Sequence, residues 1–381
     1  MDFRLSDEQH RLREEVVRFA KRELNDDVVL ADQQGIFAME AWKKCAEFGI
    51  QGLAVPQEYG GAGTDALTIC IAMEALGYGC SDNGLIFSIN AQMWSCEMPL
   101  VRFGNDEQKR RYLPGLCDGS LIGVQAMTEP DSGSDAFALA TKAESRSTGH
   151  VLTGTKTFVT NAPYADVFIV FASSDPGNGF AGISAFLVDA DSPGVSVGRP
   201  FHKMGLRTSP MAELVLDGCF VPSERMLSAP GAGMAVFNHS MTWERSCILA
   251  SAVGTMQRQL ERCVEYARER RQFDQPIGHF QAVSHRIVDM RVRLEMARLL
   301  VYRQGLAMEG GRPPALEAAM VKLAVSEAFV RSSLDALQVH GGYGYMTEYE
   351  IERDVRDAVG SRIYSGTSDM QRNVIAGLMG L

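Results

Sequence analysis

The sequence predicts an α+β chain, mostly α, with an N-terminal α-helical domain (1–122), a middle antiparallel β-domain (123–228) and a C-terminal helical bundle (229–381). Two observations carry this prediction. Apolar residues recur at helical spacing in the first and last regions, whereas the middle region consists of short runs rich in β-branched residues. The absence of helical patterns between those short runs favours an antiparallel barrel or sandwich over a parallel nucleotide-binding sheet.

The N-terminal region should begin with a capped helix. Ser6 and Gln9 have the spacing of a capping box. Leu12, Val16 and Phe19 then fall on one face of the following helix. Further helices are expected near 38–49, 65–78 and 84–103, separated by turns such as the glycine-rich segment 60–63.

The middle and C-terminal regions differ in the period of their apolar residues. Strands are expected at 151–160, 166–173, 183–190 and 212–222, each bounded by turn-forming residues. A long helix is expected at 281–308, a break at 310–314 and another helix at 315–339. The first of these helices carries a bundle-type apolar seam, formed by Val283, Ile287, Met290, Leu294, Ala297 and Val301.

Composition excludes several classes of protein. The 381 residues are 46% hydrophobic and 22% charged, which is typical of a globular protein with buried cores. No apolar run is long enough to span a membrane, and no secretory signal is visible. The net charge of −10 argues against a nucleic-acid partner.

The eight cysteines show neither a C-x-x-C pair nor histidines at zinc-site spacing. No metal site is therefore expected. Buried free thiols are the better interpretation, and they favour a cytoplasmic location.

Four short motifs combine polar residues with glycines that allow close backbone approach. The segment 125–135 offers hydroxyl and backbone donors suited to a flat heteroaromatic ring. In the segment 338–345, three glycines within four residues follow a helix and not a strand, which disfavours a Rossmann NAD site. The other two motifs are the segments 362–372 and 268–281. Each motif alone is weakly specific.

Together and in this order, the four motifs resemble those of the acyl-CoA dehydrogenases over essentially the whole chain. The resemblance implies that family's fold, with a C-terminal four-helix bundle, and FAD as cofactor. It also implies a homodimer or homotetramer, because the family shares its FAD site between subunits.

The resemblance assigns one set of residues to the flavin of the same subunit. Gln125, Met127 and Thr128 should face the flavin ring, and Gly133 and Ser134 should lie where the pyrophosphate and the substrate arm pass. The remaining members of this set are Phe158 and Thr160, which cover the flavin, and Thr367, a further FAD contact. The family commonly has tryptophan in place of Phe158.

A second set should reach FAD bound mainly by a neighbouring subunit. The residues expected at the adenosine end are Arg270, Gln272, Phe273 and Gln281. Those expected at the pyrophosphate are Gln338, Gly341 and Gly342.

One position departs from the family's usual pattern. Most members carry their catalytic glutamate where this chain has Ser365, and a serine hydroxyl cannot abstract an α-proton unaided. Glu244 matches the position of the base in isovaleryl-type dehydrogenases, so we expect Glu244 to be the catalytic base. The alternative is that Glu244 and Arg245 form a solvated ion pair on a helix surface.

The resemblance therefore implies an FAD-dependent dehydrogenase that oxidises the α,β C–C bond of an acyl thioester. Ser134, Arg245 and Ser365 are the expected substrate contacts, with the Ser365 N–H polarising the thioester carbonyl. The residues around Glu244 and Ser365 are most similar to enzymes that oxidise L-prolyl groups on a peptidyl or acyl carrier protein. An isovaleryl-type acyl-CoA dehydrogenase and a non-catalytic flavin-binding relative are the alternatives. The expected electron acceptor is an electron-transfer flavoprotein or O2.

Overall fold

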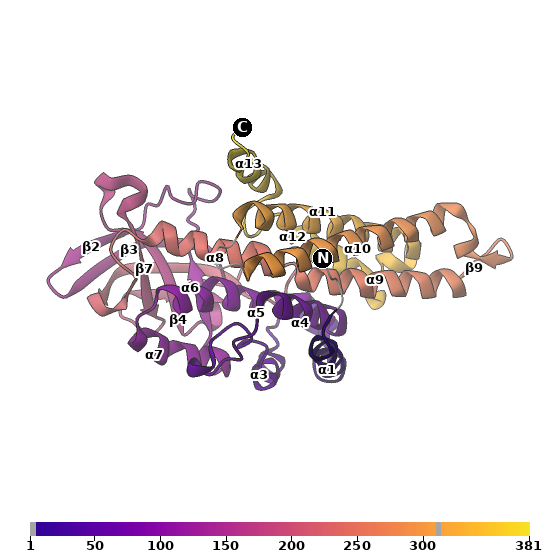
Figure 1. Cartoon of the computed structure of the whole chain (residues 1–381), viewed down its shortest axis with the longest axis horizontal. Coiled ribbons are helices and arrows are strands. Elements are labelled where there is room, and N and C mark those ends of the chain that lie inside the picture. The colour runs from indigo at the N-terminus through magenta and orange to yellow at the C-terminus, as the bar shows by residue number, and fades with distance from the viewer. Residues whose placement is uncertain (1–4, 310–313) are drawn as a thin grey trace.

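The computed structural model describes residues 5–309 and 314–381, which form two helical regions and a sheet that lies at one end of the molecule (Figure 1). The predicted order of helices, sheet and helices is confirmed. The N-terminal helices are α1 (Asp7–Glu23), α2 (Val28–Gln34), α3 (Met39–Phe48), α4 (Ala66–Gly79), α5 (Asn83–Gln92), α6 (Met98–Phe103) and α7 (Asp106–Cys117). The helices α2 and α7 were not predicted.

Helix α1 begins at the predicted capping box. The Ser6 hydroxyl accepts a hydrogen bond from the Gln9 backbone N–H at 3.1 Å, and the Gln9 side-chain oxygen accepts one from the Ser6 N–H at 3.0 Å. Val16 and Phe19 are buried and Leu12 packs partly buried against the same core. The predicted amphipathic face is therefore confirmed.

The predicted helix 84–103 is continuous but contains a π-helical segment, Met93–Glu97, between α5 and α6. Pro99 has no N–H to donate to a carbonyl one turn earlier, and the Met98 N–H bonds to the Met93 carbonyl instead. The wider turn accommodates the proline inside the helix.

The sheet corrects one prediction. Its strands follow the order β6-β7-β3-β2-β4-β5-β8, and most neighbours are antiparallel, but β1 and β2 both pair with β4 in parallel. The long connection 127–141 between β1 and β2 lets both strands run in the same direction, which short hairpins cannot do. The strands are β1 (Gly123–Ala126), β2 (Lys142–Arg146), β3 (Gly149–Thr160), β4 (Val167–Ser173), β5 (Ile183–Asp189), β6 (Val195–Val197), β7 (Met211–Pro222) and β8 (Met226–Leu227).

The C-terminal region is built from long helices. Helices α9, α10 and α11 pack on one another, and α8, α12 and α13 pack against α11. In the predicted seam of α10, Met290 onward is buried, and Val283 and Ile287 are partly buried. Most of the predicted break at 310–314 lies outside the described residues. The elements are α8 (Gly233–Cys247), α9 (Ala250–Glu269), the hairpin β9 (Arg271–Gln272) and β10 (Gln275–Pro276), α10 (Gln281–Met308), α11 (Ala315–His340), α12 (Ile351–Gly360) and α13 (Ser368–Leu378).

Two glycines bring the N-terminal helices into close contact with the bundle. A Cβ atom on Gly77 of α4 would collide with the Ser251 backbone at the start of α9, and one on Gly254 would collide with the Glu74 carbonyl. Arg258 of α9 reaches across and donates to the Gly77 carbonyl at 2.6 Å. The two backbones can therefore approach only because both positions lack a side chain.

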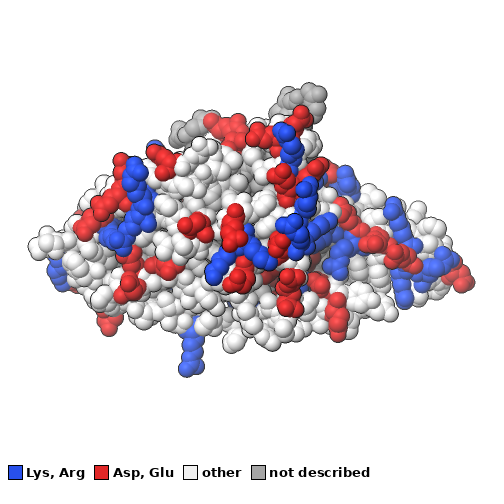
Figure 2. All heavy atoms as spheres, turned by 90° about the horizontal axis from the view of Figure 1, so that it is seen from below, with Lys and Arg blue, Asp and Glu red and all other residues white. Residues whose placement is uncertain are grey.

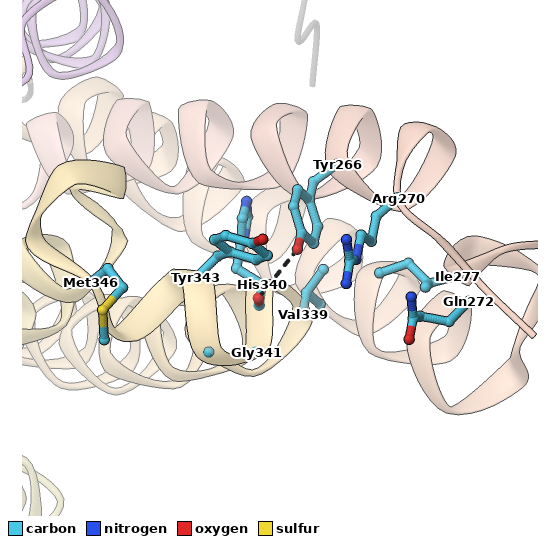
Figure 3. A pocket seen from close by; sticks show the side chains of 10 residues that line it. Tyr266, Arg270, Gln272, Ile277, Val339, His340, Gly341, Tyr343 and Met346 are labelled. Carbon is cyan, nitrogen blue, oxygen red and sulfur yellow. Dashed lines mark hydrogen bonds between the residues drawn. The ribbon is translucent and has the colours of Figure 1, made fainter.

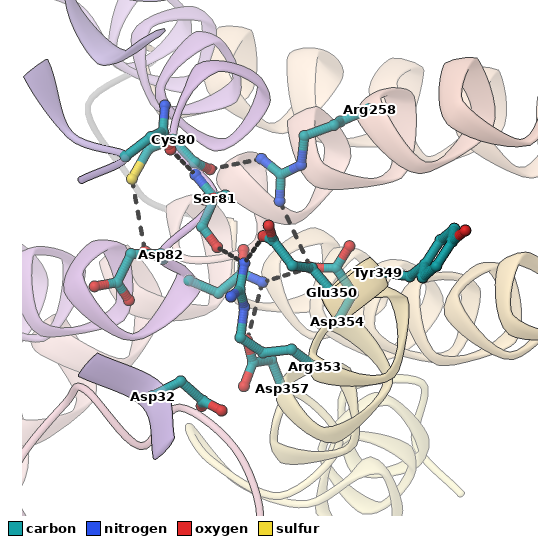
Figure 4. A network of polar contacts seen from close by, with 12 residues as sticks. Asp32, Cys80, Ser81, Asp82, Arg258, Tyr349, Glu350, Arg353, Asp354 and Asp357 are labelled. Atoms are coloured by element: carbon teal, nitrogen blue, oxygen red, sulfur yellow. Dashed lines mark hydrogen bonds and ion pairs between the residues drawn. The ribbon is translucent and has the colours of Figure 1, made fainter. Parts of the chain in front are cut away.

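A buried polar network fixes α12 against the other two regions (Figure 4). The Asn83 amide donates to Asp354 at 3.0 Å and to Asp357 at 3.1 Å, and the Leu206 N–H donates to Asp357 at 2.6 Å. Arg258 pairs with Asp354 at 3.6 Å. Because α12 leads directly into residues 361–367, this network also positions the segment that carries Ser365.

On the face shown in Figure 2, basic side chains lie beside acidic ones, so neither sign of charge dominates that surface. Within the described residues no helix is both long enough and apolar enough to cross a membrane.

Candidate active site

Glu244 and Ser365 meet between α8 and the turn that follows α12. The Ser365 hydroxyl donates a hydrogen bond to Glu244 Oε1 at 2.7 Å. Only 8% of Glu244 is exposed. The neighbouring Trp243 stacks on Trp94 of the π-helical segment, with ring centroids 5.9 Å apart. The position with the expected base and the position that lacks one therefore lie side by side.

The alternative of a solvated Glu–Arg pair is wrong. Glu244 is buried, and it makes no ion pair with Arg245 within 4 Å among the described residues. Arg245 Nε instead donates to the Ser365 carbonyl at 3.2 Å. Burial raises the pKa of Glu244, whereas the Ser365 hydrogen bond and the cations of Arg245 and Lys322 lower it. A carboxyl group with a raised pKa is suited to accept a proton near neutral pH.

The turn at Ser365 has an unusual backbone. Ser365 and Gly366 both have positive φ, 57° and 87°. Their carbonyls accept hydrogen bonds from three helices: Arg245 of α8, Lys322 of α11 at 2.8 Å, and Gln371 of α13 at 3.1 and 2.9 Å. These bonds stabilise a conformation that serine adopts rarely.

Strand β1 carries Gln125, and the loop after it carries Met127 and Thr128, beside α8. The Ser240 hydroxyl of α8 donates to Gln125 Oε1 at 2.8 Å, and the Thr157 N–H donates to the Thr128 carbonyl at 2.8 Å. Met127 is buried, whereas Gln125 and Thr128 are partly exposed. These contacts tie the predicted flavin-facing residues to both the sheet and the helix that bears Glu244.

A buried ion pair holds this loop on β3. Lys156 Nζ lies 2.6 Å from Glu129 Oε1 and donates to the Met127 carbonyl at 3.2 Å. Glu129 also accepts hydrogen bonds from the backbone N–H groups of Ala140 and Thr141. Both charged groups therefore have hydrogen-bond partners besides each other, as a buried charge requires.

The other predicted residues near the sheet are more exposed. Phe158 lies at a register shift of β3 with φ 55° and is 61% exposed, and its ring lies 5.6 Å from that of Phe201. Thr160 is partly buried, and Gly133 and Ser134 are exposed. The bulge turns an aromatic side chain outward, which leaves a flat apolar surface available to a ligand.

The second predicted set lies at the far end of the bundle, around β9 (Figure 1). Residues of this set line a pocket of about 420 Å³ (Figure 3). Arg270 lies over the ring of Tyr343, 5.5 Å from its centroid, and His340 stacks on Tyr266 at 4.5 Å. The set's lining members are Arg270, Gln272, Gly341 and Gly342.

Three residues of the second set lie outside that pocket lining. Phe273 is 88% exposed, and Gln281 and Gln338 are also exposed. Thr367 belongs with the first site, since it follows the Ser365 turn and caps α13 by accepting from the Met370 N–H. Within one chain, the predicted residues therefore lie at two separate places.

Both places present open backbone that suits part of a flavin dinucleotide. A Cβ atom built on Gly133, Gly341 or Gly342 would meet no atom within 4 Å, so each backbone faces open space. Gly341 also has φ 59°, which suits glycine. The exposed Phe158 offers a ring-stacking surface, and the pocket beside Arg270 offers a cation to a phosphate.

Sequence reasoning missed several residues of this site, namely Lys322, Gln371 and the pair Glu129–Lys156. Lys322 carried a signal, because it is the one charged residue in the run 318–326 of the predicted helix. Its partner, the Gly366 carbonyl, could not be foreseen. Within the described residues, no cluster of His, Cys, Asp or Glu side chains is arranged to hold a metal ion.

Fold and site together define a three-region protein with an acidic group buried between α8 and the turn that follows α12. Three family profiles match the chain: the acyl-CoA dehydrogenase N-terminal domain at 6–120, the middle domain at 124–219 and the C-terminal domain at 231–379. The chain belongs to the acyl-CoA dehydrogenase family.

The relatives are similar over nearly their whole length. An L-prolyl-[peptidyl-carrier protein] dehydrogenase of Pseudomonas fluorescens is 46% identical over 341 residues, covering 89% of this chain and 90% of the relative. The crystal structure of the prolyl acyl carrier protein oxidase AnaB is 47% identical with a TM-score of 0.98, covering 99% of this chain and 100% of the other. The structure of PigA with FAD and proline is 42% identical with a TM-score of 0.98, covering 100% of both chains.

Proposed function

We propose that this protein is an FAD-dependent dehydrogenase that oxidises an L-prolyl group held as a thioester on a peptidyl or acyl carrier protein. The observation that carries the proposal is the buried Glu244 carboxylate, hydrogen-bonded to Ser365 where most family members have their glutamate. The names of the relatives AnaB, PigA and the Pseudomonas enzyme support the substrate class.

Gln125, Met127, Thr128, Phe158 and Thr160 would hold the isoalloxazine end of FAD, which when bound supplies the acceptor for a hydride. Gly133, Ser134 and Thr367 would contact the rest of the cofactor, and Ser134 would also contact the substrate arm. The tie between Gln125 and Ser240 keeps this surface in a fixed relation to α8. Since that helix also bears Glu244, cofactor and base would be oriented together.

Glu244 would accept the α-proton of the substrate. The α-C–H bond breaks, its electron pair stays on the substrate and its proton passes to the Glu244 carboxylate. The Ser365 N–H has no hydrogen-bond acceptor among the described residues, so it is available to the thioester carbonyl. Arg245 holds the carbonyl side of the same turn and would reach the substrate from there. A β-hydrogen then leaves as hydride, and turnover needs an acceptor such as an electron-transfer flavoprotein or O2.

The exposed second set supports a shared cofactor site. We propose that Arg270, Gln272, Phe273, Gln281, Gln338, Gly341 and Gly342 contact FAD bound by another subunit of a homodimer or homotetramer. An independent observation is a stripe of exposed apolar side chains at helical spacing along α10: Val288, Val292, Met296 and Leu299. Such a stripe on a soluble helix is typical of an association surface.

We also make one proposal about the domain boundaries and one about the location of the protein. The domain boundaries 1–122, 123–228 and 229–381 fall in connections between elements of the structure. All eight cysteines are free and buried, which supports a reducing compartment and hence a cytoplasmic location.

The proposed function is tested with the purified full-length protein. It should be yellow, and released flavin should be FAD near one per subunit. The FAD-loaded protein is then mixed with L-prolyl-carrier protein or with isovaleryl-CoA, and the acyl group is weighed by mass spectrometry. Loss of hydrogen from the prolyl group alone supports the proposal. Oxidation of isovaleryl-CoA alone supports the branched-chain alternative, and oxidation of neither supports a non-catalytic relative.

A further inference from the structure

Lys322 is a fully buried lysine on α11. Its exposed fraction is 0%, and its ammonium lies 5.7 Å from the centroid of the Tyr364 ring. Among the described residues no carboxylate lies within 4 Å of this ammonium. Lysine is rarely buried without an ion-pair partner, because removing its charge from water is costly. Within the described part of the chain, its ammonium donates one hydrogen bond, to the Gly366 carbonyl at 2.8 Å.

That hydrogen bond acts on the turn that contacts Glu244. Arg245, Lys322 and Gln371 all donate to the carbonyls of Ser365 and Gly366. The N–H groups of these two residues have no acceptor within the described part of the chain. The donors therefore fix the carbonyl side of the turn and leave its N–H side free. Lys322 donates to the Gly366 carbonyl, Arg245 donates to the Ser365 carbonyl, and Gln371 donates to both.

The charged and titratable groups around Glu244 and Lys322 come from two helices and from the turn that follows α12. Arg245 lies on α8, Glu327 on α11, and Arg362 and Tyr364 follow α12. Glu327 is already bound by Arg362 at 2.9 Å and by the Ser368 hydroxyl at 2.8 Å. The remaining acid near Lys322 is Glu244, whose pKa is lowered by Lys322 and Arg245 against the effect of burial.

The pKa of Lys322 supports this arrangement. Burial lowers it to about 7, and the Glu244 carboxylate acts in the opposite direction. The charge of each group therefore acts on the protonation of the other. A change at Lys322 should therefore be visible in the pH dependence of a step that uses Glu244.

We propose that Lys322 is a positioning residue for proton transfer to Glu244: it fixes the Ser365–Gly366 turn through the Gly366 carbonyl and keeps the buried Glu244 carboxylate in its proton-accepting form. The inference rests on the proposed role of Glu244 as base. Lys322 itself exchanges no proton with the substrate in this scheme. It provides a donor and a positive charge.

Two substitutions separate these contributions. Lys322→Met removes both the donor and the charge, whereas Lys322→Gln retains a donor. Removing a cation raises the pKa of Glu244, so the acidic limb of the pH–rate profile should move to higher pH in both variants, by about one unit or more. At a pH below the acidic limb of the wild type, a shift of one unit corresponds to about a tenfold loss of rate. The maximal rate should fall further in Lys322→Met than in Lys322→Gln.

The measurement is single-turnover bleaching of FAD-loaded, full-length protein from pH 5 to 9, with a thioester that bleaches the wild type. Arg298→Met is the matched control, because Arg298 is a largely buried cation that pairs with Glu74, outside this site. It should lower the melting temperature without moving the acidic limb.

The outcomes distinguish this inference from the proposed function. If Glu244→Gln bleaches at the wild-type rate, the proposed base is wrong. If Glu244→Gln is slow but both Lys322 variants keep the wild-type acidic limb, only the role of Lys322 is overturned. Lower stability or FAD content with an unmoved limb would assign Lys322 a merely structural role and would overturn the inference too.

Discussion

The two places that carry the predicted site residues differ in how complete they are within one chain. Around Glu244, the side chains are largely buried, and the carbonyls of Ser365 and Gly366 accept hydrogen bonds from side chains on three helices. Around Gly341, the side chains are largely exposed, and the glycine backbones face open space. A buried centre held by hydrogen bonds is pre-organised before any ligand arrives, whereas an open surface gains its order from what binds to it. The chemistry should therefore depend on the first place, and retention of the cofactor on the second.

The largest effect is expected at the base. Glu244→Gln keeps the shape of the side chain and a hydrogen-bonding amide, but it removes the proton-accepting oxygen. Bleaching by the thioester substrate should slow by about 10² to 10⁴, the usual contribution of a positioned base, while FAD content stays at the wild-type level. Adding Ser365→Glu should restore part of the rate, since it places a carboxylate at the family's commoner position. No recovery would show that this turn cannot deliver a base to the substrate.

The next largest effect concerns the buried ion pair between Lys156 and Glu129. Lys156→Met leaves the Glu129 carboxylate buried without its cation, which costs about 3–5 kcal/mol of unfolding free energy in comparable cases. Urea unfolding followed by far-UV circular dichroism measures the change. Arg146→Ala is the control, because the Arg146–Glu144 pair is exposed and should contribute at most about 1 kcal/mol. Equal effects of the two substitutions would contradict the distinction between buried and exposed pairs.

At the Gly341 pocket, the effect should be on affinity and assembly. Arg270→Ala removes a cation from the pocket wall, so FAD should bind about tenfold or more weakly, with about 1.4 kcal/mol for each factor of ten. The bleaching rate of the fully loaded fraction should not change. Light scattering should show FAD only in dimers or larger species. A stable FAD-loaded monomer would rule out the shared site.

The smallest effect is expected for Ser365→Ala. This substitution removes the hydroxyl that donates to Glu244 but keeps the backbone N–H that is proposed to meet the thioester carbonyl. The bleaching rate should fall by less than about tenfold, because a hydrogen bond to a charged group typically contributes about 1.5–3 kcal/mol and water can replace part of it. A loss as large as that of Glu244→Gln would mean that the serine hydroxyl itself takes part in proton transfer.

Much of the architecture was predictable because it follows from the local periodicity of the sequence. The helix 281–308 was predicted with the bounds that the structure shows, and the Ser6 cap needs only four adjacent residues. The parallel pairing of β1 and β2 with β4 was not predictable, because it depends on the path of the loop 127–141. The π-helical turn before Pro99 was missed for a similar reason, since a single proline permits several backbone solutions.

The site residues likewise divide into those that the sequence reveals and those that it does not. Glu244 could be proposed because Ser365 lacks the carboxylate that the family's pattern needs, and the structure places the two side chains 2.7 Å apart. Lys322 could not, because its function depends on a carbonyl 44 residues away in the sequence. Every residue has a backbone carbonyl, so the identity of the accepting residue does not reveal such a hydrogen bond. Long-range positioning residues are therefore the part of a site that a single sequence reveals least.

The close contact between Gly77 and Gly254 has a mechanical consequence. Helices separated by side chains can slide as rotamers change, but two backbones in direct contact have no such freedom. Arg258 adds a hydrogen bond across the contact. Helices α4 and α9 therefore form one rigid unit that joins the N-terminal helices to the bundle. Any movement that admits a carrier-bound substrate would then involve other parts of the molecule, with α4 and α9 as the fixed frame.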